Sequence, residues 1–188
     1  MPDWQRVDDI QLLIAAQSGD AEAFGELYER YAGRVFRFLY AHLDDRLDAE
    51  DLTEDVFLRV WKSLSGYREQ GVPFLAFLFR VARNALIDHY RRSGGLKRDV
   101  ALEDLPLKDH SPGPVEAVMI DLEHQKLRQT LEKLREDYRT VLVLRYLGEL
   151  SPEETAQAMG RSSGAVRVLQ HRALIALRSL MEGAVGFD

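Results

Sequence analysis

Four side chains near the end of the sequence can bind anions and have no acidic neighbour: Arg161, Arg167, His171 and Arg178. No Asp or Glu occurs between positions 161 and 181, although the whole chain carries a formal net charge of -6. Guanidinium groups donate paired hydrogen bonds to phosphates and to guanine edges. The acid-free run therefore indicates a surface for DNA, and a helical hairpin with merely solvated arginines is the alternative that the run alone leaves open.

The residues that must position this run predict two short helices joined by a tight turn. Ser151 and Glu154 have the spacing of a capping box at a helix N-terminus, and Gly160 suits a left-handed helix end. Ser162 or Ser163 then caps a second helix. Its apolar residues recur at intervals of three and four and form one buried stripe: Val166, Leu169, Ala173, Leu177 and Leu180. The pattern is that of a helix-turn-helix with a basic outer face.

Positive charge gathers in two islands of an otherwise acidic chain. Residues 80–98 contain six basic residues against Asp88 alone, a local charge of +5, and residues 161–181 have a local charge of +4. The remaining residues then carry -15. Such a chain should bind DNA poorly by itself, and its acidic surface implies a second, basic partner.

Helical periodicity also organises the rest of the chain. A first helix is expected from Asp8 or Asp9 to Gly19, with Ile10, Leu13 and Ile14 inward. Further helices are expected at 20–43, 49–64, 73–92, 115–134 and 136–147, and residues 93–114 have the composition of a linker. The predicted fold class is all-α: two small helical domains, 1–92 and 115–188, joined by a flexible linker, with the helix-turn-helix in the second.

Catalytic and metal-binding patterns are missing from the sequence. The five histidines are dispersed, there is no cysteine, and Gly94-Gly95 lacks the Lys that a phosphate loop requires. The carboxylates between positions 48 and 55 indicate the acidic start of a helix. We therefore expect no enzyme, no cofactor and no metal. The acidic N-terminus and the short apolar runs predict no secretory signal and no membrane span, and hence a cytoplasmic protein.

A loop between two expected helices offers a different kind of DNA contact. Tyr67 and Arg68 lie outside the helical phase of the neighbouring apolar residues, next to the basic helix 73–92. Loop aromatics beside a basic helix can stack on unpaired bases, at about 1–3 kcal/mol per base. The first domain would then hold a separated strand while the second reads duplex DNA.

Three segments resemble one family. DAEDLTEDVFLRVW (48–61), PFLAFLFRVARNALIDHYRR (73–92) and SPEETAQAMGRSSGAVRVLQHRALIALR (151–178) are similar to the characteristic regions of extracytoplasmic-function (ECF) sigma factors of bacterial RNA polymerase, group 4 of the sigma-70 family. The resemblance covers residues 10–92 and 115–182, in the family's order. It implies a factor that binds core polymerase and directs promoter-specific initiation, with an anti-sigma factor as a further partner.

The resemblance also implies residue roles. Docking on the clamp helices of the largest polymerase subunit falls to Asp48, Glu50, Asp51, Glu54, Asp55 and Trp61. Melting and capture of the -10 element fall to Ser65, Tyr67, Arg68, Arg80, Arg83, Asn84, Asp88, Arg91 and Arg92. The second domain docks near the polymerase flap, and the -35 element is read by Arg161, Ser163, Gly164, Arg167, Val168, His171, Arg172 and Arg178.

The chain departs from the family pattern at two places. Phe77 stands where Trp is usual, and Arg167-Val168-Leu169-Gln170 replaces a Lys-Ser-Arg-Leu-like run, so the -35 preference cannot be copied from relatives. Arg167 is the expected base-edge contact, because bidentate arginine–guanine pairs are the commonest specific contact. Two other hypotheses stay open from the residues alone: a stand-alone helix-turn-helix regulator, and a helical interaction module without a DNA role.

Overall fold

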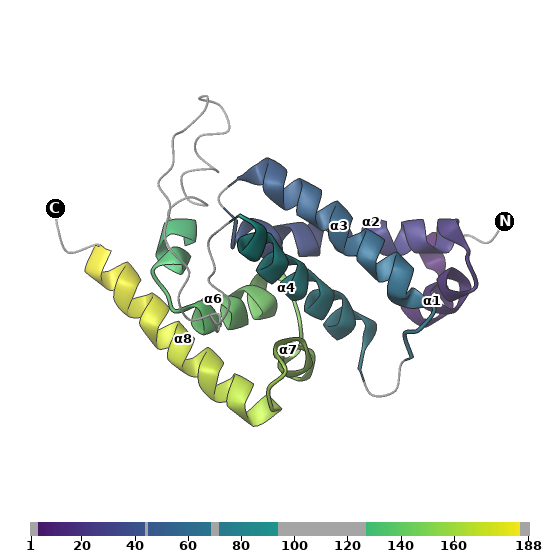
Figure 1. The fold of residues 1–188 in the computed structure, drawn as a ribbon. Coiled ribbons are helices and arrows are strands. Elements are labelled where there is room, and N and C mark those ends of the chain that lie inside the picture. Colours follow the sequence, from purple (N-terminus) through teal and green to yellow (C-terminus); the bar gives the residue numbers. More distant parts are fainter. Residues whose placement is uncertain (1–3, 44, 69–71, 94–126, 185–188) are drawn as a thin grey trace.

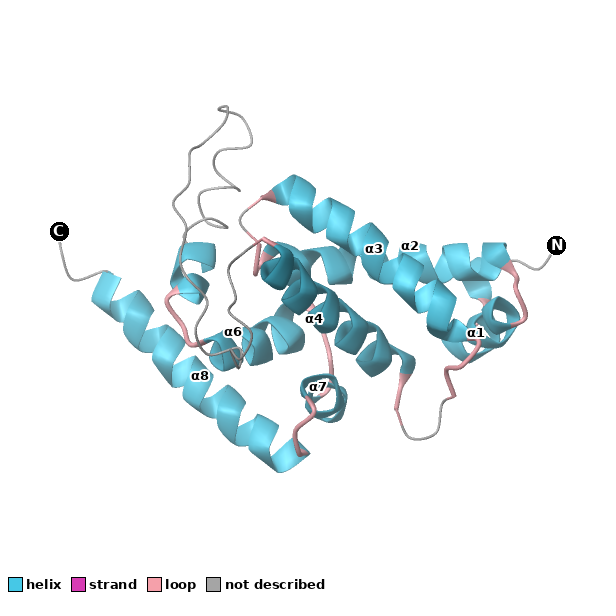
Figure 2. Cartoon of the chain, in the orientation of Figure 1, coloured by secondary structure: helices cyan, strands magenta, loops and turns pink. Residues whose placement is uncertain are grey.

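Helices make up the regular structure of residues 4–43, 45–68, 72–93 and 127–184, which are the part of the chain that the computed structural model describes (Figures 1 and 2). In chain order they are the short 3-10 turn η1 (Trp4–Arg6), α1 (Asp9–Gln17), α2 (Ala21–Tyr40), α3 (Arg46–Leu64), α4 (Phe74–Arg92), a helical segment at 127–132, α6 (Glu136–Leu142), the π-helical turn η2 (Val143–Leu147), α7 (Pro152–Met159) and α8 (Ser163–Ala184). The all-α prediction is confirmed. The predicted linker after Ser93, and the first part of the helix expected from 115, lie outside the described residues.

Aspartate caps begin the three N-terminal helices. Asp8 accepts a hydrogen bond from Gln11 N of α1, Asp20 caps α2 and Asp45 caps α3, each satisfying amide groups that have no partner inside the helix. α1 and α3 pack on α2, and α4 packs on α3. Phe38 and Phe79, from α2 and α4, are fully buried and meet edge to face at 5.6 Å. We call residues 4–93 the first helical unit.

The buried face of α1 differs from the prediction. Leu12, Leu13 and Ala16 are buried against α2, whereas Ile10 and Ile14 are 55% and 59% exposed. The expectation that Ile10 and Ile14 point inward is therefore wrong. The helix's own apolar residues occupy most of its sides, so their spacing does not select one buried face. Contact with α2 decides which side is buried.

The helix-turn-helix forms as the sequence predicts. Ser151 and Glu154 complete the capping box of α7, and Gly160 ends the helix in the left-handed region at φ 66°. Of the two candidate caps for α8, Ser162 accepts the hydrogen bond, from Ala165 N at 3.2 Å. The predicted stripe of α8 is confirmed: Val166, Leu169 and Ala173 are buried, and Leu177 and Leu180 are half-buried. We call residues 127–184 the second helical unit.

The two helical units pack against each other, which the sequence did not predict. α7 lies against α4, and η2 contacts α2 (Figure 1). Gly148 sits so close to α4 that a Cβ added there would lie 3.1 Å from Phe79 Cε1. Arg34 of α2 donates two hydrogen bonds to the carbonyl of Gly148, at 2.9 and 2.5 Å. The buried residues of both units consequently form one continuous core.

A buried polar cluster joins α2 to α6 inside this contact. His42 Nδ1 lies 2.8 Å from Phe38 O, and His42 Nε2 lies 3.6 Å from Glu136 Oε1. Burial lowers the pKa of His42 to about 4, against the attraction of Glu136. Desolvation by itself would raise the pKa of Glu136, but attraction to the protonated form of His42 and to Arg139, with hydrogen bonds from Arg139 and Thr140, lowers it. The native state therefore holds His42 neutral and Glu136 ionised near neutral pH.

We predict that acid destabilises the fold through His42. Below its ordinary pKa of 6.5, the unfolded chain protonates this side chain and the native state does not until about pH 4. Stability is therefore lost as pH falls through that window, by about 2–3 kcal/mol, and further loss from Glu136 follows below its ordinary pKa. Urea unfolding from pH 7 to 4 measures this. The His42→Gln variant should show a shallower decline, and parallel curves for both proteins would contradict the prediction.

Candidate nucleic-acid interface

The outer face of α8 gathers the predicted -35 residues. Gly164, Arg167, Val168, His171 and Arg172 are exposed and fall at intervals of three and four, on the side opposite the buried stripe. Ser163 is half-exposed at the start of the helix, and Arg178 lies exposed two turns further along. A helix that presents such a row to solvent has the dimensions of a major-groove reader.

Arg167 and Arg161 of this predicted set pair with carboxylates of the same chain. Arg167 Nη2 lies 3.1 Å from Glu153 Oε1, and both side chains are largely exposed. Arg161, in the turn before α8, lies 3.8 Å from Asp137 of α6. The exposed Arg167–Glu153 pair is worth about 0–1 kcal/mol, so an incoming phosphate can replace its carboxylate.

Some of the predicted -10 residues have exposed side chains, and others are bound to residues of the same chain. Arg80, Asn84, Arg91 and Arg92 are exposed on α4, and Ser65 and Arg68 are exposed in the loop before it. Asp88 is instead held by Arg59 of α3, whose Nη1 lies 2.8 Å from Asp88 Oδ2. Asp88 thus joins α3 to α4.

Tyr67 corrects the prediction of an exposed loop aromatic. Its side chain is buried, its ring lies 4.8 Å from that of Phe77, and its hydroxyl donates to Val72 O at 2.7 Å. Gln17 of α1 also donates to the carbonyl of Tyr67. The loop folds back so that the ring closes the end of the core. Because loop residues have no helical phase, the sequence pattern could not show this burial.

Arg83 also departs from the expected outer face of α4. It follows Ala76 and Phe79 on the side of the helix that meets the second helical unit, where both are buried. Burial lowers the pKa of Arg83, Glu136 opposes this effect and Arg161 adds to it. Among the described residues, no hydrogen-bond partner reaches its buried Nε. Arg83 thus lies half-buried between the units.

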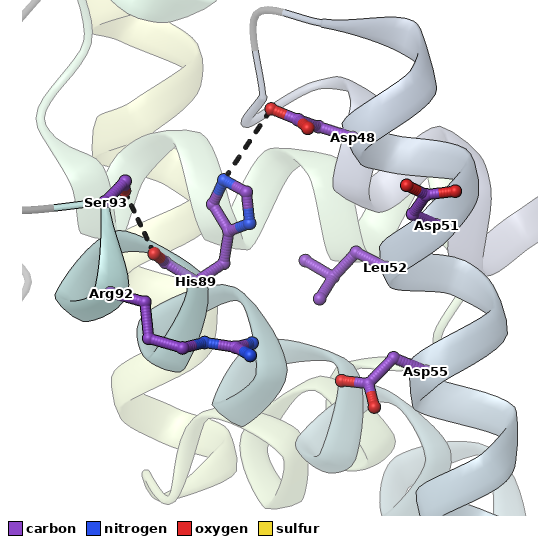
Figure 3. Close-up of a pocket in the computed structure, with 7 residues that line it drawn as sticks. All are labelled: Asp48, Asp51, Leu52, Asp55, His89, Arg92 and Ser93. Atoms are coloured by element: carbon purple, nitrogen blue, oxygen red, sulfur yellow. Dashed lines mark hydrogen bonds and ion pairs between the residues drawn. The ribbon is translucent and has the colours of Figure 1, made fainter.

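The acidic residues of α3 either face the end of α4 or pair with arginines of their own helix. Asp48, Asp51 and Asp55 line a cavity of about 470 Å³, whose opposite wall comes from His89, Arg92 and Ser93 at the end of α4 (Figure 3). His89 Nε2 approaches Asp48 Oδ2 to 3.9 Å across it. Glu50 pairs with Arg46, and Asp55 with Arg59. Trp61 packs its half-buried ring 4.7 Å from that of Phe24.

Two exposed leucines on α3 were missed in the sequence analysis. Leu47 and Leu58 are 67% and 56% exposed and share a helix face with the exposed Asp51 and Glu54. Their positions, 47, 51, 54 and 58, follow helical spacing out of phase with the buried residues of α3. This spacing could have been read from the sequence, because it places two leucines on the acidic side of the helix, where they would be exposed.

The arrangement of α7, α8 and α4 indicates the class of protein. A left-handed glycine turn precedes a long helix with an acid-free outer face, and a second basic helix lies in the other unit. These are the features of a helix-turn-helix DNA-binding protein. Among the described residues, no helix is both long and apolar enough to span a bilayer, and no three His, Cys, Asp or Glu side chains are grouped to hold a metal ion.

Comparisons with known proteins give the family. Sigma-70 region 2 matches residues 27–95, and sigma-70 region 4 matches residues 124–177. SigD of Mycobacterium tuberculosis, an ECF RNA polymerase sigma factor, is 35% identical over 93% of this chain and 83% of its own length. The ECF sigma factor BldN of Streptomyces coelicolor is 34% identical over 92% of this chain, which spans 65% of BldN. The chain belongs to the ECF sigma factor family.

The fold comparison agrees with the sequence comparison. The structure of CnrH in complex with the cytosolic domain of CnrY matches with a TM-score of 0.69 and 28% identity, over 93% of this chain and 97% of CnrH. The match therefore includes both helical units.

We predict that the buried Tyr67 side chain stabilises the folded protein. Tyr67→Phe removes the hydrogen bond to Val72 O and should cost about 0.5–1.5 kcal/mol of unfolding free energy, whereas Tyr67→Ala also empties a buried site and should cost about 3–5 kcal/mol. Chemical denaturation measures both. Arg68→Ala, exposed in the same loop, is the control and should change stability by less than about 0.5 kcal/mol. A Tyr67→Ala protein of unchanged stability would show that the ring is not part of the core.

Proposed function

We propose that this chain binds core RNA polymerase and directs initiation at promoters by recognising a -35 and a -10 element. The observation that carries the proposal is the outer face of α8, which has no acidic residue between 161 and 181 and follows a left-handed glycine turn. Family membership supplies the setting, because region 2 and region 4 occur in order along the chain. The chain would act by binding rather than by catalysis, in the cytoplasm, where bacterial transcription takes place.

The second helical unit would read the -35 element with α8. The exposed row from Gly164 to Arg172 can enter a major groove, with Arg167 on a base edge and Arg161 and Arg178 near phosphates. The pair between Arg167 and Glu153 supports this role, because it holds the guanidinium at the surface without burying it. The same unit would dock near the polymerase flap.

The first helical unit would capture the -10 element with α4 and the loop before it. Arg80, Asn84, Arg91 and Arg92 are the exposed candidates on the helix, and Ser65 and Arg68 are those in the loop. Tyr67 and Asp88 would position this surface rather than contact DNA. Tyr67 is buried in the core, and Asp88 forms an ion pair with Arg59. Arg83 would join the surface only when the second unit moves away.

Docking on the polymerase clamp helices would use the outer face of α3. Asp48, Asp51 and Glu54 are exposed carboxylates, and Leu47 and Leu58 add apolar contacts at the two ends of the face. The other predicted residues, Glu50, Asp55 and Trp61, have partners within the chain and would shape this face. An acidic surface with two apolar anchors fits a basic amphipathic partner.

The division of labour would follow the domains expected from the sequence: region 2 in 1–92, a linker in 93–114 and region 4 in 115–188. CnrH has been solved with the cytosolic domain of CnrY. We expect this chain likewise to bind a partner protein, which by its family resemblance would be an anti-sigma factor.

A selection experiment tests the proposal. The full chain, core RNA polymerase and a pool of duplexes with randomised sequence are mixed at a stated salt concentration, since phosphate contacts are salt-dependent. Retained sequences should converge on two elements, and templates that carry them should support initiation only when chain and core are both present. Tight and selective binding by the chain without core would contradict the proposal.

We predict that reversing two charges on α3 disrupts docking. Asp51→Lys with Glu54→Lys should weaken core binding by about tenfold or more, because like charges replace complementary ones. Fluorescence polarisation of the labelled chain against core polymerase measures the affinity. Glu22→Lys with Glu29→Lys makes the same charge change on exposed positions of α2 and should leave docking near the wild-type value. Equal losses in both double variants would remove the docking assignment.

We predict that Arg167→Ala relaxes sequence preference at the -35 element. Loss of a bidentate base contact should cost about 1–3 kcal/mol on the selected sequence and less on its single-base variants. Competition binding of the holoenzyme measures the difference. An equal loss on every sequence would identify Arg167 as a phosphate contact instead.

A further inference from the structure

A hydrogen-bond network at the edge of α8 involves residues outside the predicted -35 set. Gln170 Oε1 accepts from Arg145 Nε at 3.2 Å, and Gln170 Nε2 donates to the hydroxyl of Tyr146 at 3.2 Å. Arg145 and Tyr146 are consecutive residues of η2, and Arg145 Nη1 also donates to the carbonyl of Leu150, just before the capping box of α7. The network therefore joins η2, α8 and the start of α7 at one place.

The donor and acceptor roles in this network fix the direction of the Tyr146 hydroxyl. A guanidinium group can only donate, so the amide oxygen of Gln170 faces Arg145 and its amide nitrogen faces Tyr146. The phenol oxygen accepts that hydrogen bond, and its own proton is left to donate elsewhere. Within the part of the chain that the structure describes, no acceptor takes this proton. Because Tyr146 is 54% exposed, its hydroxyl offers an unused donor at the surface.

This donor lies beside the row that would read the -35 element. Gln170 follows Arg167 by three residues and is half-exposed, between the outer row and the buried stripe of α8. An α-helix with its side chains is about 10–12 Å wide, close to the roughly 12 Å width of the major groove. The flank of a reading helix therefore meets the DNA backbone, and tyrosine hydroxyls are among the groups that bind phosphates there.

Gln170 also belongs to the run in which the chain departs from the family pattern. Arg167-Val168-Leu169-Gln170 replaces a Lys-Ser-Arg-Leu-like run, so an apolar leucine is the usual residue at the position of Gln170. A leucine could neither accept from Arg145 nor donate to Tyr146. The network is therefore a feature of this chain and does not follow from the family pattern.

We propose that Tyr146 is a further -35 contact of this chain: its hydroxyl donates to one DNA phosphate at the edge of the groove that α8 would enter, and Gln170 is the positioning residue that orients it. The inference rests on the proposed function and deepens it, because it adds a contact from outside the recognition helix. Tyrosine is neutral, so the contact adds affinity on every sequence and leaves the salt dependence unchanged. The base contact proposed for Arg167 would differ in both respects.

The first experiment removes the hydroxyl alone. Tyr146→Phe keeps the ring and loses the donor, and Tyr28→Phe removes the same atom from a half-buried tyrosine of α2 as a control. The full chain with core polymerase is titrated, over a salt series, against a duplex with the selected elements and against its single-base variants at -35. We expect Tyr146→Phe to bind every duplex about three- to tenfold more weakly, with an unchanged salt slope, and the control to bind like the wild type. Unchanged affinity of Tyr146→Phe, or a loss confined to the selected sequence, would overturn the proposal.

The second experiment identifies the phosphate. In a set of duplexes, one phosphate at a time beside the -35 element is replaced by an uncharged methylphosphonate, which removes an acceptor oxygen. At one position the replacement should cost the wild-type holoenzyme about three- to tenfold more affinity than it costs Tyr146→Phe, because only the wild type has the hydroxyl to lose. If every position costs the two proteins the same, Tyr146 acts within the protein and not on DNA, and the proposal is overturned.

A third variant tests the role of Gln170. Gln170→Met keeps the length of the side chain and removes the amide that donates to Tyr146. The hydroxyl is then no longer oriented, so the difference at the identified phosphate should shrink. A Gln170→Met chain that keeps the whole difference would overturn the positioning role.

The outcomes separate this inference from the proposed function. If the wild-type chain with core polymerase selects no -35 element, the proposed function fails. If it selects one, and Tyr146→Phe binds and responds to methylphosphonate as the wild type does, only the Tyr146 contact fails.

Discussion

The packing of α4 against α7 is the constraint on which the rest of the arrangement depends. It buries Phe79 against Gly148, where there is no room for a side chain, and it brings the Gly148 carbonyl within reach of Arg34. The buried residues of both units merge into one core. The α4–α7 contact therefore decides which side chains near it are covered and which stay exposed. Arg83 becomes half-buried, the His42–Glu136 cluster is buried, and α8 is left with its basic face outward.

Charge is distributed so that each face suits one kind of partner. α8 has an acid-free outer row, α3 carries carboxylates with two exposed leucines, and the carboxylates of α6 pair with arginines of their own unit. An acidic chain with two basic regions is a weak ligand for DNA by itself. Recruitment by a larger basic partner resolves that conflict.

Local signals predicted local structure well. The Ser151–Glu154 capping box, the left-handed Gly160 and the buried stripe of α8 depend on residues within one or two helical turns, and all three were confirmed. The predictions failed where a contact outside the residue's own helix or loop pattern decided which side is buried. α1 buries Leu12 and Ala16 because α2 packs there, and Tyr67 turns inward because Phe77 and Val72 receive it. Neither choice is encoded in the spacing of nearby residues.

The sequence by itself determined the helical fold class, the helix-turn-helix with its basic outer row, the acidic start of α3 and the family to which the chain is similar. These follow from periodicity, capping chemistry and charge order, which act along the chain. Only the tertiary structure decided that the two units share a core, that Arg83 lies half-buried where α4 meets the second unit, and that Leu47 and Leu58 stay exposed beside Asp51 and Glu54. Those features depend on which segments meet from distant parts of the sequence, and apolar burial, being non-directional, gives no local sign of its partner.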